Sequence, residues 1–190
     1  MIFVVPCRYD PTRPTILDCV QSIRKYHPDD SIVVVDSDSP DKSYFNDIKD
    51  ITNLTIEDCA NKNYIYGALW KAYERHDSDY YYLFHDSMFL KSKRYFRSWN
   101  GVGGIIQSNN LYGHSNGGVY RYGCDNQVQK EWFNNRYSSK RTFFNGLFGS
   151  SFVGSKSVLE FMIKNEMQKI LPTCKNECQA MERLLGSFFT

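Results

Sequence analysis

The chain has 190 residues, of which 42% are apolar and 16% aromatic, and a formal net charge of +2 from 23 basic and 21 acidic residues. This size fits one domain, and the balanced charge gives no electrostatic basis for binding nucleic acid or an anionic membrane. No stretch approaches the roughly 20 apolar residues of a membrane span, Met1 leads into IFVVP without a signal-peptide pattern, and the six cysteines lack paired metal-ligand spacing. We therefore expect a soluble cytoplasmic protein with free thiols.

The first 90 residues predict alternating strands and helices. The apolar runs at 2–6 and 31–36 predict buried parallel strands, and residues 14–27 between them carry apolar side chains at helical spacing. The elements expected next are a short helix at 40–51, a strand at 53–58, a helix at 63–76 and a strand at 79–85. This order predicts a doubly wound α/β sheet.

The second half is rich in glycine, asparagine and tyrosine and predicts loops with short strands. GGIIQS at 103–108 predicts one strand, and FNGLFGSSFVGS at 144–155 predicts a strand pair interrupted by glycines. Two helices are expected at 155–170 and 176–186. The chain ends on the apolar run LLGSFFT, which favours a domain that belongs to a longer protein.

Polar side chains follow three of the predicted strands. The first strand runs into PCRYD, the second into DSDSPD and the fourth into HDSM. Ligands of an open parallel sheet bind outside the carboxyl ends of its strands. Neither GxGxxG nor GxxxxGK is present, so a phosphate ligand here would need a divalent cation held by carboxylates.

These motifs together resemble a known family. IFVVPCRYD, IVVVDSDSPD, NYIYGALWKAYER and a hydrophobic strand ending in HDSM occur in the order and spacing typical of GT-A fold glycosyltransferases of the family-2-like group. The resemblance covers roughly the first 90 residues and implies a GT-A fold, a Rossmann-like and mostly parallel central sheet flanked by helices, with a loop-rich C-terminal half. It also implies one catalytic domain over 1–190, with a nucleotide-binding half at 1–90 and an acceptor and catalytic half at 91–190.

The resemblance implies a metal site at the end of the fourth strand. Asp86 would bind Mn²⁺ or Mg²⁺ between the two phosphates of the donor, while His85 and Ser87 would assist with the diphosphate or a metal-bound water. The family's DxD motif is degenerate here, because His85-Asp86-Ser87 has one carboxylate where DxD has two. A turn or cap role for Asp86 and a core role for His85 are the structural alternatives.

The resemblance also implies contacts to the nucleoside. Asp36 or Asp38 would bind the base, with turn formation as the alternative for each. Tyr9 would stack on the base, and Arg8, after Pro6, would meet phosphate or ribose. Asn63 and Gly67 would let the backbone approach the donor, although Gly67 also fits a close packing contact.

A glycosyltransferase that inverts the sugar needs a base that accepts the proton of the attacking hydroxyl. The family places this carboxylate near a late helix, which makes Glu177 and Glu182 the candidates. A structural Glu182–Arg183 pair is the alternative for the latter. His114, in the glycine-rich YGHSNGG segment, is a third candidate.

The resulting hypothesis is a glycosyltransferase that uses a nucleoside-diphosphate sugar, most simply a UDP-sugar, and a glycan or glycoprotein acceptor. Three alternatives stay open at this point. They are a non-catalytic sugar-nucleotide-binding module, a sugar-nucleotide nucleotidyltransferase, and a flavodoxin-like domain.

Overall fold

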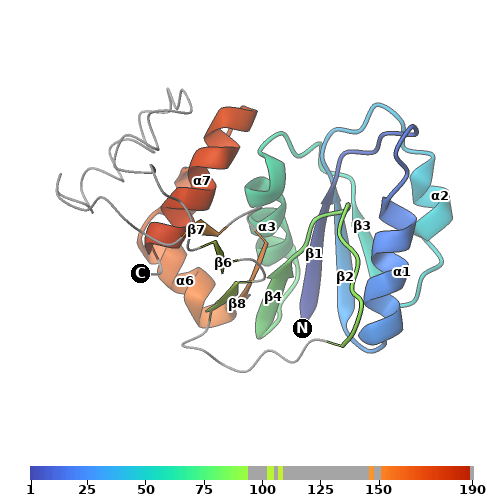
Figure 1. Cartoon of the computed structure of the whole chain (residues 1–190), viewed down its shortest axis with the longest axis horizontal. Coiled ribbons are helices and arrows are strands. Elements are labelled where there is room, and N and C mark those ends of the chain that lie inside the picture. The colour runs from blue at the N-terminus through green and yellow to red at the C-terminus, as the bar shows by residue number, and fades with distance from the viewer. Residues whose placement is uncertain (94–101, 105–106, 109–145, 148–150, 189–190) are drawn as a thin grey trace.

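The computed structural model describes residues 1–93, 102–104, 107–108, 146–147 and 151–188 (Figure 1). The strands of its main sheet are β1 (Ile2–Cys7), β2 (Ser31–Asp36), β3 (Leu54–Glu57), β4 (Tyr80–Leu83), β5 (Val102–Gly104) and β8 (Phe152–Ser155). The helices are α1 (Ile16–Tyr26), α2 (Tyr44–Ile48), α3 (Tyr64–Arg75), α6 (Lys156–Lys164), the 3₁₀ turn η2 (Met167–Lys169) and α7 (Lys175–Phe188). None of the helices in the described ranges is long and apolar enough to cross a membrane.

The main sheet has the order β3-β2-β1-β4-β8-β5. β1, β2, β3 and β4 run parallel to one another, whereas β8 is antiparallel to both of its neighbours. This mostly parallel sheet flanked by helices confirms the predicted α/β fold class and is consistent with the GT-A type. The order of the strands reverses between β1 and β4, which makes their carboxyl ends the expected ligand site.

Two apolar clusters cover the two faces of the sheet. Alternate residues of β1 separate accordingly, since Ile2 and Val4 pack with α3, α6 and α7, whereas Phe3 and Val5 pack with α1 and α2. Figure 1 shows α1 and α2 on one side of the molecule and α6 and α7 on the other. Each large aliphatic side chain that is fully buried in this way contributes about 1.5–3 kcal/mol, so the two clusters fix the sheet firmly.

Pro6 opens the sheet between β1 and β4. The Val4 carbonyl accepts a hydrogen bond from the Phe84 N–H at 2.9 Å, so that edge of β1 faces β4. Pro6 comes two residues later on the same edge and has no N–H to donate. The two strands therefore separate after Val4, and the chain beyond each of them is released to line a pocket.

Three predictions for the second half need correction. The segment 144–155 does form two strands, but β7 (Gly146–Leu147) pairs with β6 (Gln107–Ser108) in a separate two-stranded sheet, whereas β8 pairs with β4 and β5. The single strand expected at 103–108 is accordingly two strands, β5 and β6. The single helix expected at 155–170 is divided because Glu166 adopts a left-handed backbone conformation, with φ of 61°.

Candidate functional site

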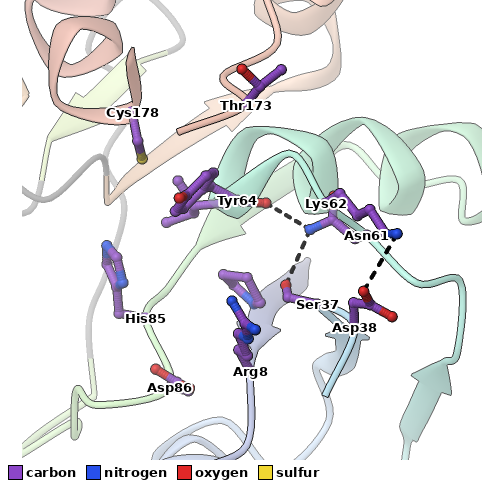
Figure 2. A pocket seen from close by; sticks show the side chains of 12 residues that line it. Arg8, Ser37, Asp38, Asn61, Lys62, Tyr64, His85, Asp86, Thr173 and Cys178 are labelled. Carbon is purple, nitrogen blue, oxygen red and sulfur yellow. Dashed lines mark hydrogen bonds and ion pairs between the residues drawn. The ribbon is translucent and has the colours of Figure 1, made fainter. Parts of the chain in front are cut away.

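A pocket of about 530 Å³ lies at the carboxyl ends of β1, β2 and β4 (Figure 2). One side of it, here called the strand-end wall, consists of residues at or just after these strands. The other side, here called the helix-start wall, consists of residues around the beginnings of α3 and α7. The strand-end wall is formed by Pro6, Arg8, Ser37, Asp38, His85 and Asp86, and the helix-start wall by Asn61, Lys62, Tyr64, Ile65, Thr173 and Cys178.

Asp86 is the half-buried carboxylate of the strand-end wall. Burial raises the pKa of its carboxyl above the usual range, and the neighbouring His85 and a hydrogen bond from the Cys7 side chain oppose that shift. The Cys7 thiol is itself buried, and burial together with the Asp86 charge raises the pKa of this thiol, which therefore stays protonated and can donate to the carboxylate. A carboxylate held in this way is costly to leave without a counter-charge, which favours a cationic or proton-donating ligand.

Asp36 and Asp38 have separated roles, although they lie two residues apart. Asp36 is fully buried, and its carboxylate accepts hydrogen bonds from the Ser39 N–H at 2.9 Å and the Tyr44 hydroxyl at 3.3 Å. Asp38 is exposed, lines the pocket and lies 3.6 Å from Lys62 Nζ. Asp36 therefore builds the turn, the alternative that the sequence left open, and Asp38 is the carboxylate that a ligand can reach.

Tyr9 does not line the pocket and already has an aromatic partner. Its ring stacks on that of Tyr44 with centroids 4.9 Å apart, and its N–H donates to Ser39 Oγ at 2.8 Å. Ser87 is exposed and likewise lies outside the pocket lining. Arg8, by contrast, is exposed and lines the pocket.

Asn61 organises the helix-start wall. This buried side chain donates through Nδ2 to Ser37 Oγ at 3.1 Å and to the Tyr64 carbonyl at 2.7 Å, and its Oδ1 accepts from the Asn63 N–H at 3.1 Å. Figure 2 shows two of these bonds, one to Ser37 just after β2 and one to Tyr64 at the start of α3. The Asn61 side chain thus joins the two walls of the pocket, beside the ion pair between Lys62 and Asp38.

The close approach of the Asn61 side chain explains why position 67 is a glycine. A Cβ at position 67 would lie 2.2 Å from Asn61 Oδ1 and 2.7 Å from Asn63 Cβ, distances that no real side chain tolerates. Glycine inside a helix costs about 1 kcal/mol relative to alanine, so the position favours close packing over helix propensity. Gly67 therefore leaves room for the Asn61 side chain, which is the close packing contact that the sequence analysis gave as an alternative.

Asn63 connects α3 to the segment before α7. Its Nδ2 donates to the Pro172 carbonyl at 3.2 Å, which brings Thr173 beside the beginning of α3. Asn63 thus shapes the pocket without lining it.

Glu177 is buried and binds Thr173. Its Oε2 accepts from the Thr173 N–H at 2.7 Å and from Thr173 Oγ1 at 2.9 Å. Thr173 lines the pocket and Glu177 does not. Glu182 lies further along α7 and raises the pKa of the Cys178 thiol, although burial is the larger cause. His114 lies outside the described residues.

Seven pocket residues were not predicted from the sequence. Most of them surround the start of α3, where the polar residues NKN at 61–63 precede an apolar helix. This pattern indicates a polar turn but does not show which of its side chains face a pocket. Nothing local in the sequence marks the two residues contributed by the α7 region. The seven are Ser37, Asn61, Lys62, Tyr64, Ile65, Thr173 and Cys178.

The described residues do not gather three or more His, Cys, Asp and Glu side chains into a group that could hold a metal ion. Asp38, the other carboxylate of the pocket, is paired with Lys62. Mg²⁺ is often bound through one or two carboxylates and the phosphates of a ligand. Asp86 therefore fits a cation that is shared with a phosphate group rather than one held by protein side chains alone.

No protein-family model matches the chain, and no curated protein matches it by sequence. Among solved structures, the chain is similar to the crystal structure of S. aureus TarS 1–349, with a TM-score of 0.49 and 8% sequence identity. The alignment covers 97% of this chain and 55% of that one, so the chain spans about half the length of this neighbour. Similarity at this level establishes neither a shared family nor a shared activity.

Proposed function

We propose that the pocket binds a nucleoside-diphosphate sugar, most simply a UDP-sugar, and that the chain is a glycosyltransferase acting on a hydroxyl of a glycan or glycoprotein. The observation that carries this proposal is the place of the pocket. It lies at the carboxyl ends of β1 and β4, where the strand order reverses, and it combines Asp86 with Arg8 and Lys62.

The charges around the pocket suit a diphosphate. Arg8 supplies a cationic group from the strand-end wall, and Lys62 supplies one from the exposed margin of the helix-start wall. Asp86 would hold Mn²⁺ or Mg²⁺ together with the phosphates, and the ion would neutralise the charge of the departing diphosphate. The raised pKa of Asp86 without a ligand is consistent with this role, because a bound cation favours the ionised carboxylate.

The proton of the attacking hydroxyl needs an acceptor, and Glu177, Glu182 and His114 remain the candidates. Glu177 is the candidate with a direct link to the pocket, through its two hydrogen bonds with Thr173. We propose it as the base, within a single catalytic domain that covers residues 1–190. Because Glu177 does not itself line the pocket, the Thr173 hydroxyl would take the proton of the attacking hydroxyl while giving its own proton to Glu177.

The test is the release of UDP from a panel of UDP-sugars, with Mn²⁺, Mg²⁺ or EDTA, for the wild type and Asp86→Ala. The matched control is Asp47→Ala, which removes an exposed carboxylate of α2 away from the pocket. We expect one donor to be hydrolysed slowly, with loss of at least about 100-fold in Asp86→Ala or EDTA and none in Asp47→Ala.

Other outcomes would identify the alternatives. Cation-dependent binding of UDP without turnover, also in the presence of candidate acceptors, would indicate a non-catalytic binding module. Release of pyrophosphate from a nucleoside triphosphate and a sugar phosphate would indicate a nucleotidyltransferase. A failure to bind any nucleotide would overturn the proposal.

A further inference from the structure

Tyr64 begins α3 in an unusual backbone conformation. Its φ is 54°, a left-handed value that is a genuine outlier for a bulky residue. The hydrogen bond from Asn61 Nδ2 to the Tyr64 carbonyl holds this conformation, and the Asn61 side chain is buried against Gly67. The surrounding structure thus maintains strain at one pocket residue, a feature that is enriched at ligand sites.

The strained residue presents an aromatic ring to the pocket. Tyr64 is 38% exposed and lines the cavity. In Figure 2 its side chain extends from the start of α3 toward the side where Cys178 and His85 lie. Tyr9, which the sequence suggested for stacking, has its ring against Tyr44 instead. Among the described residues that line the pocket, Tyr64 is therefore the one whose phenyl ring can contact a ligand.

The surroundings of Tyr64 favour the sugar over the base as the group that it contacts. Its neighbours in the helix-start wall, Ile65, Thr173 and Cys178, carry no charge at neutral pH, because the pKa of the Cys178 thiol is raised to about 12. Thr173 Oγ1, although it donates to Glu177, can still accept a hydrogen bond from a sugar hydroxyl. The hydrogen-bonding groups that would suit a base or ribose lie across the pocket, at Ser37 and Asp38.

We infer that Tyr64 is the platform on which the sugar ring of the donor packs, and that it determines which sugar is accepted. A pyranose has a face of C–H bonds, which carry partial positive charge and pack on the negative face of an aromatic ring. The edge of the pyranose carries hydroxyls, one of which would donate a hydrogen bond to Thr173 Oγ1. The inference rests on the proposed function, because it assigns the sugar subsite of the same pocket.

The experiment compares the binding of UDP, UDP-glucose and UDP-N-acetylglucosamine by titration calorimetry in the presence of Mn²⁺. The variants are Tyr64→Ala, Tyr64→Leu, which keeps bulk without an aromatic face, and Tyr64→Phe, which keeps the ring. The control is Tyr80→Ala, because Tyr80 is equally exposed, at 39%, but begins β4 at the opposite end of the strand from the pocket. Thermal unfolding of each variant shows whether it is folded.

We expect Tyr64→Ala and Tyr64→Leu to weaken the binding of the preferred UDP-sugar about 2- to 10-fold, and to leave the affinity for UDP unchanged. Tyr64→Phe and Tyr80→Ala should match the wild type for all three ligands. Equal losses for UDP and the UDP-sugar would show that the ring meets the nucleoside, and would overturn the inference. Unchanged binding of the UDP-sugar by folded Tyr64→Leu would also overturn it. If the wild type binds none of the three ligands, the proposed function itself fails.

Discussion

The two walls of the pocket are built in different ways. The strand-end wall follows from the sheet, because the residues after β1, β2 and β4 must emerge at the same edge once the parallel strands are in register. The helix-start wall depends on contacts between segments far apart in the sequence, such as Asn61 with Ser37 and Asn63 with Pro172. Polar residues at the ends of buried strands therefore identify the strand-end wall from the sequence. The helix-start wall forms only when the helices pack against the sheet.

The difference also concerns what each wall offers to a ligand. The strand-end wall carries Asp86, Asp38 and Arg8, and so suits charged groups. The helix-start wall has the Tyr64 ring and neutral polar groups over most of its surface, with Lys62 at its exposed margin. The proposed donor has the same division between a charged diphosphate and a neutral sugar.

The largest expected effect is that of Glu177→Gln, which tests whether the residue behind Thr173 of the helix-start wall contributes chemistry. We expect turnover of the proposed donor with its acceptor to fall by about 10²- to 10⁴-fold, because the amide cannot accept the proton. The melting temperature should change little, because the glutamine carbonyl can still accept both hydrogen bonds from Thr173.

Glu160→Gln is the matched control, since Glu160 is an exposed residue of α6. Turnover by Glu177→Gln within a few-fold of the wild type would mean that Glu177 only positions Thr173. The base would then lie elsewhere in the chain.

A second prediction concerns the packing of Asn61, which links the two walls, against Gly67. Gly67→Ala should lower the free energy of unfolding by about 1–3 kcal/mol, because the new Cβ would overlap Asn61 Oδ1. In an Asn61→Ala background the same substitution should cost less, since the nearest clashing atom has been removed. Urea unfolding of the wild type, both single variants and the double variant measures this coupling.

Gly154→Ala serves as the comparison for this series. A Cβ at position 154 would meet Leu159 Cδ1 at 3.0 Å, the end of a flexible side chain that can move away. We expect a smaller loss than for Gly67→Ala. Strict additivity of Gly67→Ala and Asn61→Ala would contradict the assigned contact.

The smallest expected effect separates two cysteines at the start of α7. Cys174 is exposed, whereas Cys178 lines the pocket and burial raises the pKa of its thiol to about 12. At pH 7.5 iodoacetamide should therefore label Cys174 well before Cys178. Because the raised pKa leaves Cys178 almost wholly protonated, its labelling rate should rise about tenfold for each pH unit up to pH 9.5.

Mass spectrometry of peptides after timed quenching measures both rates in one sample. Labelling of Cys178 as fast as Cys174 at pH 7.5 would show that the helix-start wall is more open than described.

Several features of the fold follow from local sequence patterns. Short runs of β-branched residues predict the buried strands β1 and β2, and apolar spacing predicts α1 and α3, all within a few residues of their observed bounds. The second half is less predictable, because β8 finds its partners β4 and β5 by long-range pairing, and no local pattern specifies an antiparallel insertion. Likewise, the division between α6 and η2 depends on one left-handed residue, Glu166, at a position without glycine.

The sequence by itself determined that polar groups, above all Asp86, lie at the ends of buried parallel strands. These residues directly follow apolar runs that are buried on both faces, so they come at the point where each strand leaves the core. Only the tertiary structure decided which of these groups a ligand can reach. Asp36 and Asp38 are both aspartates of the same turn. The carboxylate of Asp36 is buried and bonded to Ser39 and Tyr44, whereas that of Asp38 lines the pocket. The tertiary structure also decided the orientation of Tyr64, because the Asn61 side chain bonds the Tyr64 carbonyl and packs against Gly67. No sequence pattern encodes such a packing contact.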